Sequence, residues 1–575
     1  MYKRLLRCVR EYKTPTFLTL LFIALEAVLE CFIPATAAQL INSVQNGAVM
    51  EDIIRSGIQL ILMAVASLCC GAIAGYTCAK ASCGFAKNLR HDVFQRIQTF
   101  SFENMDKFSS ASLVTRMTTD INNAQMSYMM LIRIAVRAPL LLIFSTVMAF
   151  TMGGNLAFAF VVIIPLLAGG LLAVARLAMP AFRRVFKKYD RLNESIEENV
   201  RAMRVVKGFS REDYEKKKFH TAAEDICADF TKAERIVALN GPIMQITIYS
   251  CIIAILWFGG QQIMIGSMQT GDLMAYFTYI MQIMMSLMMV SMIFVMLIMS
   301  KASGERIAEV LTEESTLQNP AEACCKVADG SIEFEDVSFG YYKGKDCLKN
   351  ISISIPAGSV VGILGGTGSA KSTLVSLIPR LYEANEGEVR VGGHNIKKYT
   401  LEQLRDAVAM VLQKNTLFSG SIRENLRWGR ADATDEEIAA ACRAACAEEF
   451  INSFPDGYDT HIEQGGSNVS GGQKQRLCIA RAILRKPKIL IFDDSTSAVD
   501  TATDARIREA LRRDLPGVTK IIIAQRVSSI ADADLILVMD DGRISAMGTH
   551  EELLRSSSIY REVYQQQQEG VSLHG

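Results

Sequence analysis

The stretch SVVGILGGTGSAKSTLVSLI, residues 359–378, decides the fold of the C-terminal half of this chain. Its first six residues are mostly apolar, its middle is rich in glycine, and its end has the apolar spacing of a helix. A strand, a glycine loop and a helix in this order form a phosphate-binding loop, because backbone N–H groups and a helix N-terminus together bind anionic oxygens. The loop residues expected to hold phosphate are Gly365, Gly366, Thr367, Gly368, Ser369, Ala370, Lys371, Ser372 and Thr373.

The end of this loop carries two side chains with separate expected tasks. Lys371 is expected to reach the β- and γ-phosphates, and the hydroxyl of Ser372 is expected to bind Mg²⁺. The usual pattern has glycine where this chain has Ala370. Alanine is the smallest replacement, and the loop keeps its shape if residue 370 does not need a positive φ.

Two further segments follow the loop in a recognisable order. An apolar strand expected over residues 489–492 ends in Asp493, a carboxylate suited to Mg²⁺. The sequence NVSGGQ, residues 468–473, lies about twenty residues before that strand. This order resembles the ABC transporter family, whose signature is an LSGGQ-type sequence between the phosphate loop and the acidic strand. The resemblance covers nearly the whole chain and implies an ATP-driven membrane transporter.

The resemblance assigns roles to further residues. It implies that Tyr341 stacks on adenine, that Gln413 senses Mg²⁺ and the membrane domain, and that SAVD, residues 497–500, connects two opposed ATP sites. The segment VVKGFSRED, residues 205–213, is similar to exporter helices that couple the domains. The implied cofactors are ATP and Mg²⁺, the metal held by Ser372, Gln413 and Asp493. The implied signature contacts to ATP are Ser470, Gly471, Gly472 and Gln473.

Three departures from the family pattern concern catalysis. Asp494 stands where most members have the glutamate that activates water, and Gln525 stands where they have a histidine that contacts the γ-phosphate. A loop with a family glutamate reads HIEQGG here, residues 461–466, which shifts or removes the acidic position. The shorter Asp494 draws its carboxylate back by about 1.5 Å, and a shift of order 1 Å costs about a hundredfold in rate. Glutamine cannot carry the positive charge of an imidazolium.

The signature side, in contrast, is nearly regular. Val469 replaces leucine, and the core of residues 470–473 is intact. In ABC dimers each ATP lies between the phosphate loop of one subunit and the signature of the other. We therefore expect a heterodimer with a second half-transporter that has intact glutamate and histidine. This chain resembles the degenerate half of bacterial heterodimeric multidrug exporters, and its Asp494, Gln525 and Gln413 are expected to line a slow catalytic site.

The N-terminal half is expected to span a membrane. The chain has 575 residues, of which 50% are hydrophobic, and its net charge is only +1. A hydrocarbon core of about 30 Å needs roughly 20 mainly apolar helical residues. Six such stretches are expected, over residues 15–42, 55–79, 130–152, 155–177, 239–265 and 271–300.

Basic residues indicate the orientation, since Lys and Arg stay on the cytoplasmic side of short flanks. They cluster in residues 3–13 and 183–191, so the N-terminus and the C-terminal half are expected in the cytoplasm, with the chain in the cytoplasmic membrane. The segments 80–129 and 178–238 are expected to be helices that continue past the bilayer. Breaks in their pattern at residues 118–125 and 205–212 are candidate turning points that touch a cytoplasmic domain.

The sequence thus predicts a multi-domain fold. An all-α six-helix transmembrane domain with long intracellular helices is expected over residues 1–310, and a linker over 311–329. An α/β P-loop nucleotide-binding domain with a helical signature subdomain is expected over 330–575. The near-neutral charge argues against nucleic acid as a partner. The 14 scattered cysteines contain no CxxC pair and predict neither disulfides nor a zinc site.

Residues in the expected spans suggest what is carried. The sixth span has methionines at helical spacing, which suit a pocket for varied apolar shapes or ordinary helix packing. They are Met274, Met281, Met284, Met285, Met288, Met289, Met292, Met296 and Met299. Glu26 and Glu30, one turn apart in the first span, are candidates to attract a cationic substrate or to pair with arginines.

The leading hypothesis is an exporter half that moves small amphipathic substrates, such as drugs, lipids or peptides, with membrane lipid as its surroundings. One alternative is a homodimeric lipid or peptide exporter with dedicated cargo. Another is a regulatory or channel-like membrane protein that binds ATP without pumping. An importer is disfavoured, because the membrane and nucleotide domains are fused.

Overall fold

The computed structural model describes residues 2–153, 158–323, 326–341, 344–494 and 499–572. They form two compact units. The helical unit comprises the chain up to Gln98 together with Ser110–Glu313. The α/β unit comprises Thr99–Ser109 together with residues 314 onward, so one short segment of the N-terminal half belongs to it.

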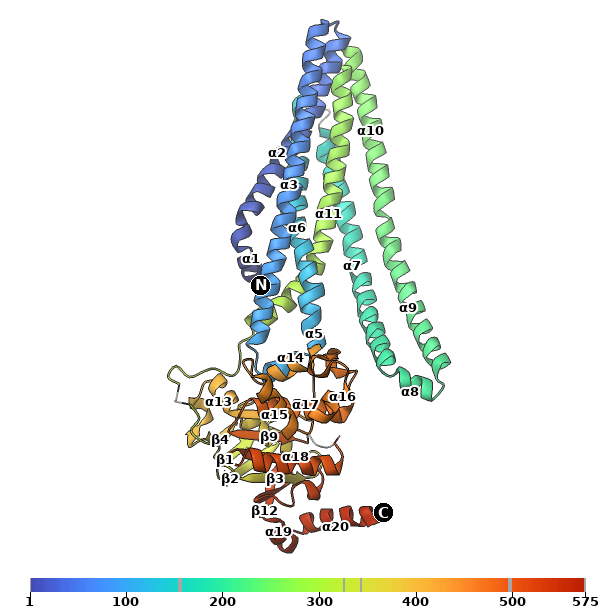
Figure 1. Ribbon diagram of the computed structural model, residues 1–575. Coiled ribbons are helices and arrows are strands. Elements are labelled where there is room, and N and C mark those ends of the chain that lie inside the picture. The colour runs from blue at the N-terminus through green and yellow to red at the C-terminus, as the bar shows by residue number, and fades with distance from the viewer. Residues whose placement is uncertain (1, 154–157, 324–325, 342–343, 495–498, 573–575) are drawn as a thin grey trace. The chain divides into compact units, whose positions relative to one another are not determined.

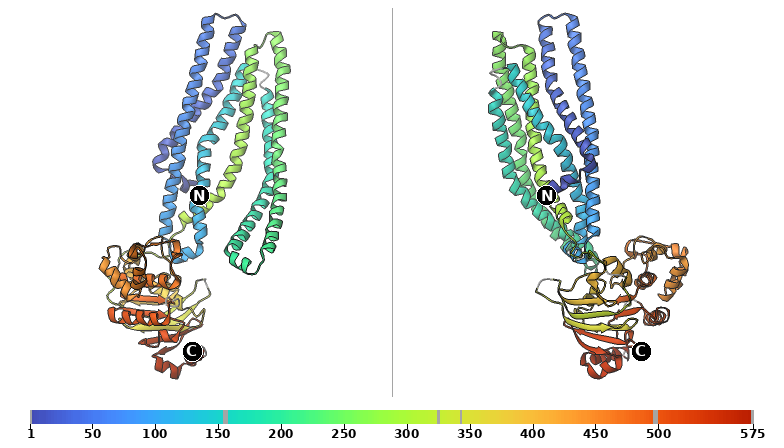
Figure 2. Two further views of the ribbon diagram at one scale, coloured as in Figure 1. Left: turned by 45° about the vertical axis from the view of Figure 1, so that its right-hand side comes forward. Right: turned by 90° about the vertical axis from the view of Figure 1, so that its left-hand side faces the viewer.

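The helical unit consists of long helices with short pieces between them. The long helices are α2 (Lys13–Gln45), α3 (Met50–Gln98), α6 (Ile121–Gly153), α7 (Phe158–Arg201), α9 (Glu212–Ala238), α10 (Asn240–Ile265) and α11 (Thr270–Thr312). Helices α2, α3, α6 and α11 contact one another, and α7 contacts α9 and α10, as Figures 1 and 2 show. At about 1.5 Å per residue a helix as long as α3 extends roughly 70 Å, more than twice the thickness of a hydrocarbon core.

Five helices in the described part of the chain are long and apolar enough to cross a membrane. Their ranges are Arg10–Gln45, Met50–Gln98, Ser110–Met152, Glu212–Ile265 and Thr270–Val290. They contain four of the six predicted spans in full and residues 271–290 of the sixth. The fourth predicted span falls mainly in α7, where a shorter apolar stretch covers Leu167–Phe182. Residues 155–157 of that span lie outside the described part.

One of the two predicted turning points is wrong. Residues 118–125 are helical, because the π-helical stretch Arg116–Asp120 runs directly into α6. The chain turns instead near α4 (Phe102–Lys107), where Ser101 accepts a hydrogen bond from the backbone of Asn104 and caps the helix. Hydrogen bonds between residues five apart, instead of four, accommodate the irregular sequence within a continuous helix.

The second predicted turning point is confirmed as a break between helices. The short helix α8 (Met203–Gly208) ends there, and α9 begins at Glu212. Ser210, between them, has a φ of 49°, a left-handed conformation that no helix interior adopts.

The α/β unit contains two main sheets. One has the strand order β12-β11-β3-β10-β9-β6, and the other has the order β2-β1-β4-β5. The six strands of the first are β3 (Val360–Gly365), β6 (Val408–Val411), β9 (Ile489–Asp493), β10 (Thr519–Ile523), β11 (Leu535–Asp540) and β12 (Arg543–Gly548). The second consists of β1 (Ile332–Phe339), β2 (Leu348–Ile355), β4 (Glu386–Val391) and β5 (His394–Asn395), paired antiparallel.

The strands that carry the expected site are neighbours in the larger sheet. Strand β10 pairs parallel with both β3 and β9, and β6 pairs parallel with β9. All residues of β9 and β10 are buried, which explains their continuous apolar runs. The carboxyl ends of parallel strands meet at one edge, so the segments that follow β3, β6, β9 and β10 converge there.

Helices complete the unit (Figure 1). They are α12 (Lys371–Leu377), α13 (Leu401–Ala407), α14 (Ile422–Arg427), α15 (Asp435–Ala444), α16 (Glu448–Ser453), α17 (Gly471–Leu484), α18 (Thr501–Asp514), α19 (His550–Ser556) and α20 (Ser558–Ser572). Helices α14, α15 and α17 begin with capping boxes at Ser421, Thr434 and Ser470. Their apolar faces join one buried core with Phe492 of β9, so the signature segment sits on a well-packed helix.

Candidate functional site

The glycine loop leaves the sheet at Gly365, the last residue of β3, and enters α12 at Lys371. A Cβ atom at Gly365 would lie 2.4 Å from the carbonyl oxygen of Met539, so only glycine fits there. Ala370 precedes the helix with a φ of 66°. Residue 370 thus adopts a positive φ, the left-handed conformation that favours glycine, so alanine is strained at this position.

Lys371 folds over the loop. Its Nζ donates hydrogen bonds to the carbonyl oxygens of Gly365 and Gly366, at 2.9 and 2.7 Å. Burial lowers the pKa of Lys371, while the negative charges of Asp494 and Asp493 oppose that shift. An ammonium group held above a ring of backbone N–H groups is suited to bind phosphate oxygens.

Ser372 and Asp493 meet across α12 and β9. The Ser372 hydroxyl donates to Oδ1 of Asp493 at 2.7 Å, and Asp493 is only 6% exposed. Burial raises the pKa of Asp493, the Ser372 hydrogen bond lowers it, and the nearby Asp494 raises it further. A hydroxyl and a carboxylate at this spacing are oxygen ligands of the kind that Mg²⁺ prefers.

Asp494 is the point where the unusual residues of this chain converge. Its Oδ2 accepts hydrogen bonds from the amide of Gln525 at 2.6 Å and from the amide of Gln413 at 3.3 Å. Asp494 itself has a φ of 46°, in the left-handed region. Gln413 follows strand β6 and Gln525 follows β10, so three separate strand ends bring these residues together.

Tyr341 follows β1 beside the start of α12. Its hydroxyl lies 3.1 Å from the hydroxyl of Thr373, and its ring is 47% exposed. It makes an edge-to-face contact with Tyr382, whose hydroxyl donates to Asp106 of helix α4 at 2.7 Å. The exposed ring leaves a flat apolar face for stacking. Sequence reasoning missed Tyr382 and Asp106, although the Ser101–Asn104 cap was a detectable signal for α4.

The signature residues lie at the N-terminus of α17. Ser470 caps the helix by accepting from the backbone N–H of Gln473, and the Gln473 side chain accepts from the backbone of Ser470. Glycines 471 and 472 leave the first turn uncovered by side chains. The hydrogen bonds of Ser470 and Gln473 join these two residues to each other. A separate set of hydrogen bonds joins Asp493 to Ser372, and joins Asp494 to Gln413 and Gln525.

Two nearby loops were also expected to matter. In the first, Glu463 accepts a hydrogen bond from the hydroxyl of Ser467 at 2.6 Å, and Gln464 begins a short helical turn. In the second, residues 497 and 498 lie outside the described part. Asp500 of that loop accepts from the backbone N–H of Thr503 at 2.9 Å and starts α18.

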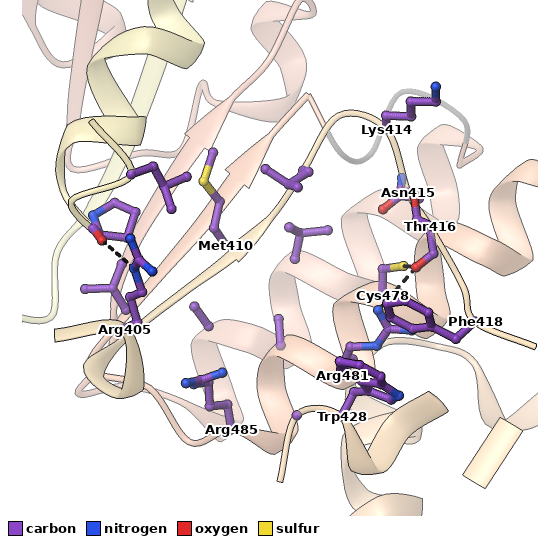
Figure 3. Close-up of a pocket in the computed structure, with 18 of the residues that line it drawn as sticks. Arg405, Met410, Lys414, Asn415, Thr416, Phe418, Trp428, Cys478, Arg481 and Arg485 are labelled. Carbon is purple, nitrogen blue, oxygen red and sulfur yellow. Dashed lines mark hydrogen bonds between the residues drawn. The ribbon is translucent and has the colours of Figure 1, made fainter. Parts of the chain in front are cut away.

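A separate groove of about 390 Å³ runs between strand β6 and helix α17, as Figure 3 shows. Phe418 and Trp428 stack at 4.2 Å between ring centroids along one wall. Arg481 reaches the groove and donates to the carbonyl oxygen of Thr416, and Arg405 and Arg485 lie at the other end. The residues that line this groove do not include the glycine loop, so the groove is distinct from the phosphate-binding segment.

The charged residues expected in the first span are paired. Arg137 of α6 donates to Glu30 of α2 at 2.6 Å and lies 3.4 Å from Glu26. Gln282 of α11 donates to the backbone oxygen of Glu30, and Ser145 of α6 donates to Gln282. The pairing with an arginine, one of the two expected outcomes, is therefore confirmed, and this polar cluster joins three helices.

Comparison with known proteins agrees with this geometry. The ABC transporter transmembrane region matches residues 16–312, and the ABC transporter family of ATP-binding domains matches residues 348–497. The chain is 35% identical over 569 residues, 98% of each chain, to an uncharacterized ABC transporter ATP-binding protein, YfiB, of Bacillus subtilis (strain 168). It is 34% identical over 561 residues, 96% of each chain, to an uncharacterized ABC transporter ATP-binding protein, Rv1273c, of Mycobacterium tuberculosis (strain ATCC 25618 / H37Rv).

One solved structure shares the fold over almost its whole length. It is described as a bacterial Atm1-family ABC exporter with ATP bound, with a TM-score of 0.82, 24% identity, and coverage of 97% of this chain and 98% of the other. Membrane-spanning helices, a phosphate loop, an acidic strand end and a capped signature helix thus occur together with family matches to both halves. The chain belongs to the ABC transporter family of ATP-hydrolysing, multi-pass membrane transporters.

Proposed function

We propose that this chain is one half of a heterodimeric ABC exporter and contributes a slow ATP site together with a working signature. The observation that carries the proposal is the environment of Asp494, whose Oδ2 accepts from both Gln413 and Gln525. A general base needs an oxygen that can take a proton from water. Here two amides already occupy one oxygen of a carboxylate that is a methylene shorter than glutamate.

Nucleotide binding, in contrast, has the groups it needs. Lys371 and the backbone of residues 365–373 are suited to the phosphates, and the Ser372–Asp493 pair is suited to Mg²⁺. Tyr341 offers an exposed ring for adenine. A site that binds ATP but orients the attacking water poorly would retain bound ATP and hydrolyse it slowly.

The signature is expected to serve the partner's ATP. Ser470 and Gln473 are organised by the capping box at the start of α17, so hydroxyl and backbone N–H groups point out of a positive helix end. In this proposal, Ser470–Gln473 complete a competent site on the partner, and the partner's signature completes the site at Lys371.

The cargo is proposed to be small and amphipathic. Five methionines of α11 are exposed. Each is separated from the next by about one or two helical turns, so all five lie on one face of the helix. They are Met274, Met281, Met285, Met288 and Met292, exposed by 46–65%. Met284, by contrast, is buried. Flexible thioethers along an open helix face adapt to varied apolar shapes.

The orientation follows from the basic segments of the chain. We place the N-terminus and the α/β unit in the cytoplasm and the helices in the cytoplasmic membrane, because Lys and Arg cluster in residues 3–13 and 183–191. Cargo is proposed to move outward, because the membrane and nucleotide-binding domains are fused in one chain, which disfavours an importer.

The slow site is tested by restoring the family's residues. The full chain, reconstituted alone, should hydrolyse ATP slowly. In the assembled transporter, where the partner's signature completes the site at Lys371, the double variant Asp494→Glu with Gln525→His should raise kcat about tenfold or more, since a shift of order 1 Å costs about a hundredfold. Asp541→Glu, an exposed position paired with Lys349, is the matched control and should change nothing. Brisk hydrolysis by the unsubstituted chain, abolished by Asp494→Asn, would refute the slow site.

The heterodimer needs a separate test. Two differently tagged copies of this chain, expressed together in the same membranes, should not purify as one complex. Copurification in a one-to-one ratio would favour the homodimeric exporter instead. Ser470→Asp keeps the helix cap but adds negative charge near the partner's phosphates. It should abolish hydrolysis by the assembled transporter, whereas Thr434→Asp at the equivalent cap of α15 should not.

A further inference from the structure

The last helix of the chain reaches back to the loop that carries Gln525. The side-chain amide of Gln567, in α20, donates through Nε2 to the carbonyl oxygen of Gln525 at 2.8 Å. Its Oε1 accepts from the backbone N–H of Val527, also at 2.8 Å. One amide thus engages the main chain on both sides of Arg526, in the way that a neighbouring strand would.

The loop held in this way is the one that aims Gln525 at Asp494. It leaves β10 after Ile523 and continues as a short helical turn at Val527–Ser529. The Gln525 side chain donates to Oδ2 of Asp494 at 2.6 Å. A displacement of the main chain between Gln525 and Val527 would therefore displace the amide that contacts Asp494.

A second anchor holds the other end of the same loop. The hydroxyl of Ser529 donates to the buried Asp504 of α18 at 3.1 Å, and Asp504 is only 4% exposed. Asp504 also pairs with Arg508, one turn later on α18. The far end of the loop is thus fixed by buried groups. Gln567 holds the end next to Gln525, where Arg526 also donates to the hydroxyl of Thr501 at 3.2 Å.

Helix α20 is placed firmly enough to act as an anchor. Tyr560 is fully buried, and its hydroxyl lies 2.7 Å from Nδ1 of His550 in α19. Gln567 follows Tyr560 by seven residues, two helical turns, so both side chains leave α20 on the same face. The burial of Tyr560 therefore directs Gln567 toward the loop.

We propose that Gln567 is a positioning residue for ATP hydrolysis, which sets the direction of Gln525 and thereby the geometry at Asp494. This role rests on the proposed function of Gln525 and Asp494 at the γ-phosphate. It makes the C-terminal helix a part of the ATP site. The bond pattern needs a donor and an acceptor on two atoms of one side chain, which the amide of glutamine supplies without a charge.

The clamp itself is tested by hydrogen–deuterium exchange on the full chain. Gln567→Ala removes both hydrogen bonds, and alanine favours helix more than glutamine, so α20 stays formed. The peptide covering residues 524–530 should exchange at least tenfold faster, and the glycine loop should not change. Gln566→Ala, the exposed neighbour on the same helix, is the matched control. Exchange equal to that of the control would overturn the proposal.

The positioning role is tested by single-turnover hydrolysis with the chain in excess over ATP. Gln567→Ala should raise the rate constant at least threefold, because a released Gln525 amide no longer occupies Oδ2 of Asp494. The chain concentration for half-saturation should stay within twofold, because the hydrogen bonds of Gln567 go to the loop at Gln525 and Val527. Faster exchange with an unchanged rate constant would make Gln567 a structural tether and overturn its positioning role. Fast multiple turnover by the unsubstituted chain would contradict the slow site while leaving the exchange result intact.

Discussion

Single residues set the chemistry of the phosphate loop, and Ala370 shows how far the sequence pattern alone could go. The glycine-to-alanine change is visible in the sequence, but whether it matters depends on φ at that position, which is 66°. A non-glycine residue in this conformation costs about 1–2 kcal/mol. The contacts around the loop therefore hold Ala370 in a backbone conformation that alanine disfavours.

Replacing Ala370 with glycine should relieve this strain. Glycine loses about 0.5–1 kcal/mol in chain entropy on folding, so we expect a net stabilisation of about 1 kcal/mol, seen as a rise of roughly 3 °C in the thermal midpoint of the α/β unit. Ala440→Gly, at an exposed position inside α15, should instead destabilise by about 1 kcal/mol. Equal losses in the two variants would show that residue 370 is not strained.

The buried carboxyl of Asp493 gives a pH-dependent prediction. Burial raises its pKa, so the folded state binds this proton more tightly than the unfolded state, and the associated stability is lost as pH rises through the raised pKa. Without metal or nucleotide, Asp493→Asn should therefore unfold at a higher temperature than the unsubstituted chain at pH 7, and the difference should shrink toward pH 4.

Asp541 is a control for Asp493, because its pKa is shifted in the opposite direction. Lys349 lowers the pKa of Asp541, so that its carboxylate stabilises the fold above the pKa of unfolded aspartate. Asp541→Asn should slightly lower the midpoint at pH 7. A midpoint for Asp493→Asn that stays below that of the unsubstituted chain from pH 4 to 8 would contradict the buried, metal-ready carboxylate.

The sequence predicted the residues of the site better than their contacts. Lys371, Ser372 and Asp493 could be named because short motifs fix their place relative to one strand or one helix. The hydrogen bonds from Gln413 and Gln525 to Asp494 could not be predicted, since they depend on which strands are neighbours in the sheet. Gln567 carried no signal at all, because a lone glutamine near a chain end is an ordinary surface residue.

At the scale of elements, long apolar periodicity predicted the helices well and their turning points less well. The turn near α4 was missed because residues 118–125 look irregular in sequence, yet a π-helical stretch absorbs that irregularity within a continuous helix. The strands β3 and β9 were predicted closely, since each is a buried apolar run that ends at a glycine or an acidic residue.

The contacts between α2 and α6 depend on one cation. Arg137 meets Glu26 and Glu30, and removing it leaves two carboxylates without a partner among apolar helices. We expect Arg137→Met to destabilise the helical unit by about 3 kcal/mol, measured as a lower thermal midpoint in detergent. Adding Glu26→Gln and Glu30→Gln should restore most of the loss. Arg133→Met, an exposed position one turn earlier on α6 that attracts Glu26 without forming an ion pair with it, should have a smaller effect, and an equal effect would rule out the ion pair as the cause.

At the scale of the molecule, the two compact units are expected to unfold separately. Each has its own buried core, one around Tyr279 of α11 and one around Phe492 of β9. Multi-domain chains commonly depart from a single two-state transition. Calorimetry of the full chain should therefore show two transitions, of which one belongs to the α/β unit with the phosphate loop.

ATP with Mg²⁺ should raise only the transition of the α/β unit. A ligand at 100 times its Kd stabilises the state that binds it by about 2.7 kcal/mol, and every phosphate-binding group described above belongs to this unit. Lys371→Ala removes the ammonium over the loop and should abolish the shift, whereas Lys488→Ala, whose Nζ contacts Ala328 away from the loop, should keep it. If ATP raised the temperatures of both transitions equally, the two units would be thermodynamically coupled, and the phosphate site could not be treated as a property of the α/β unit alone.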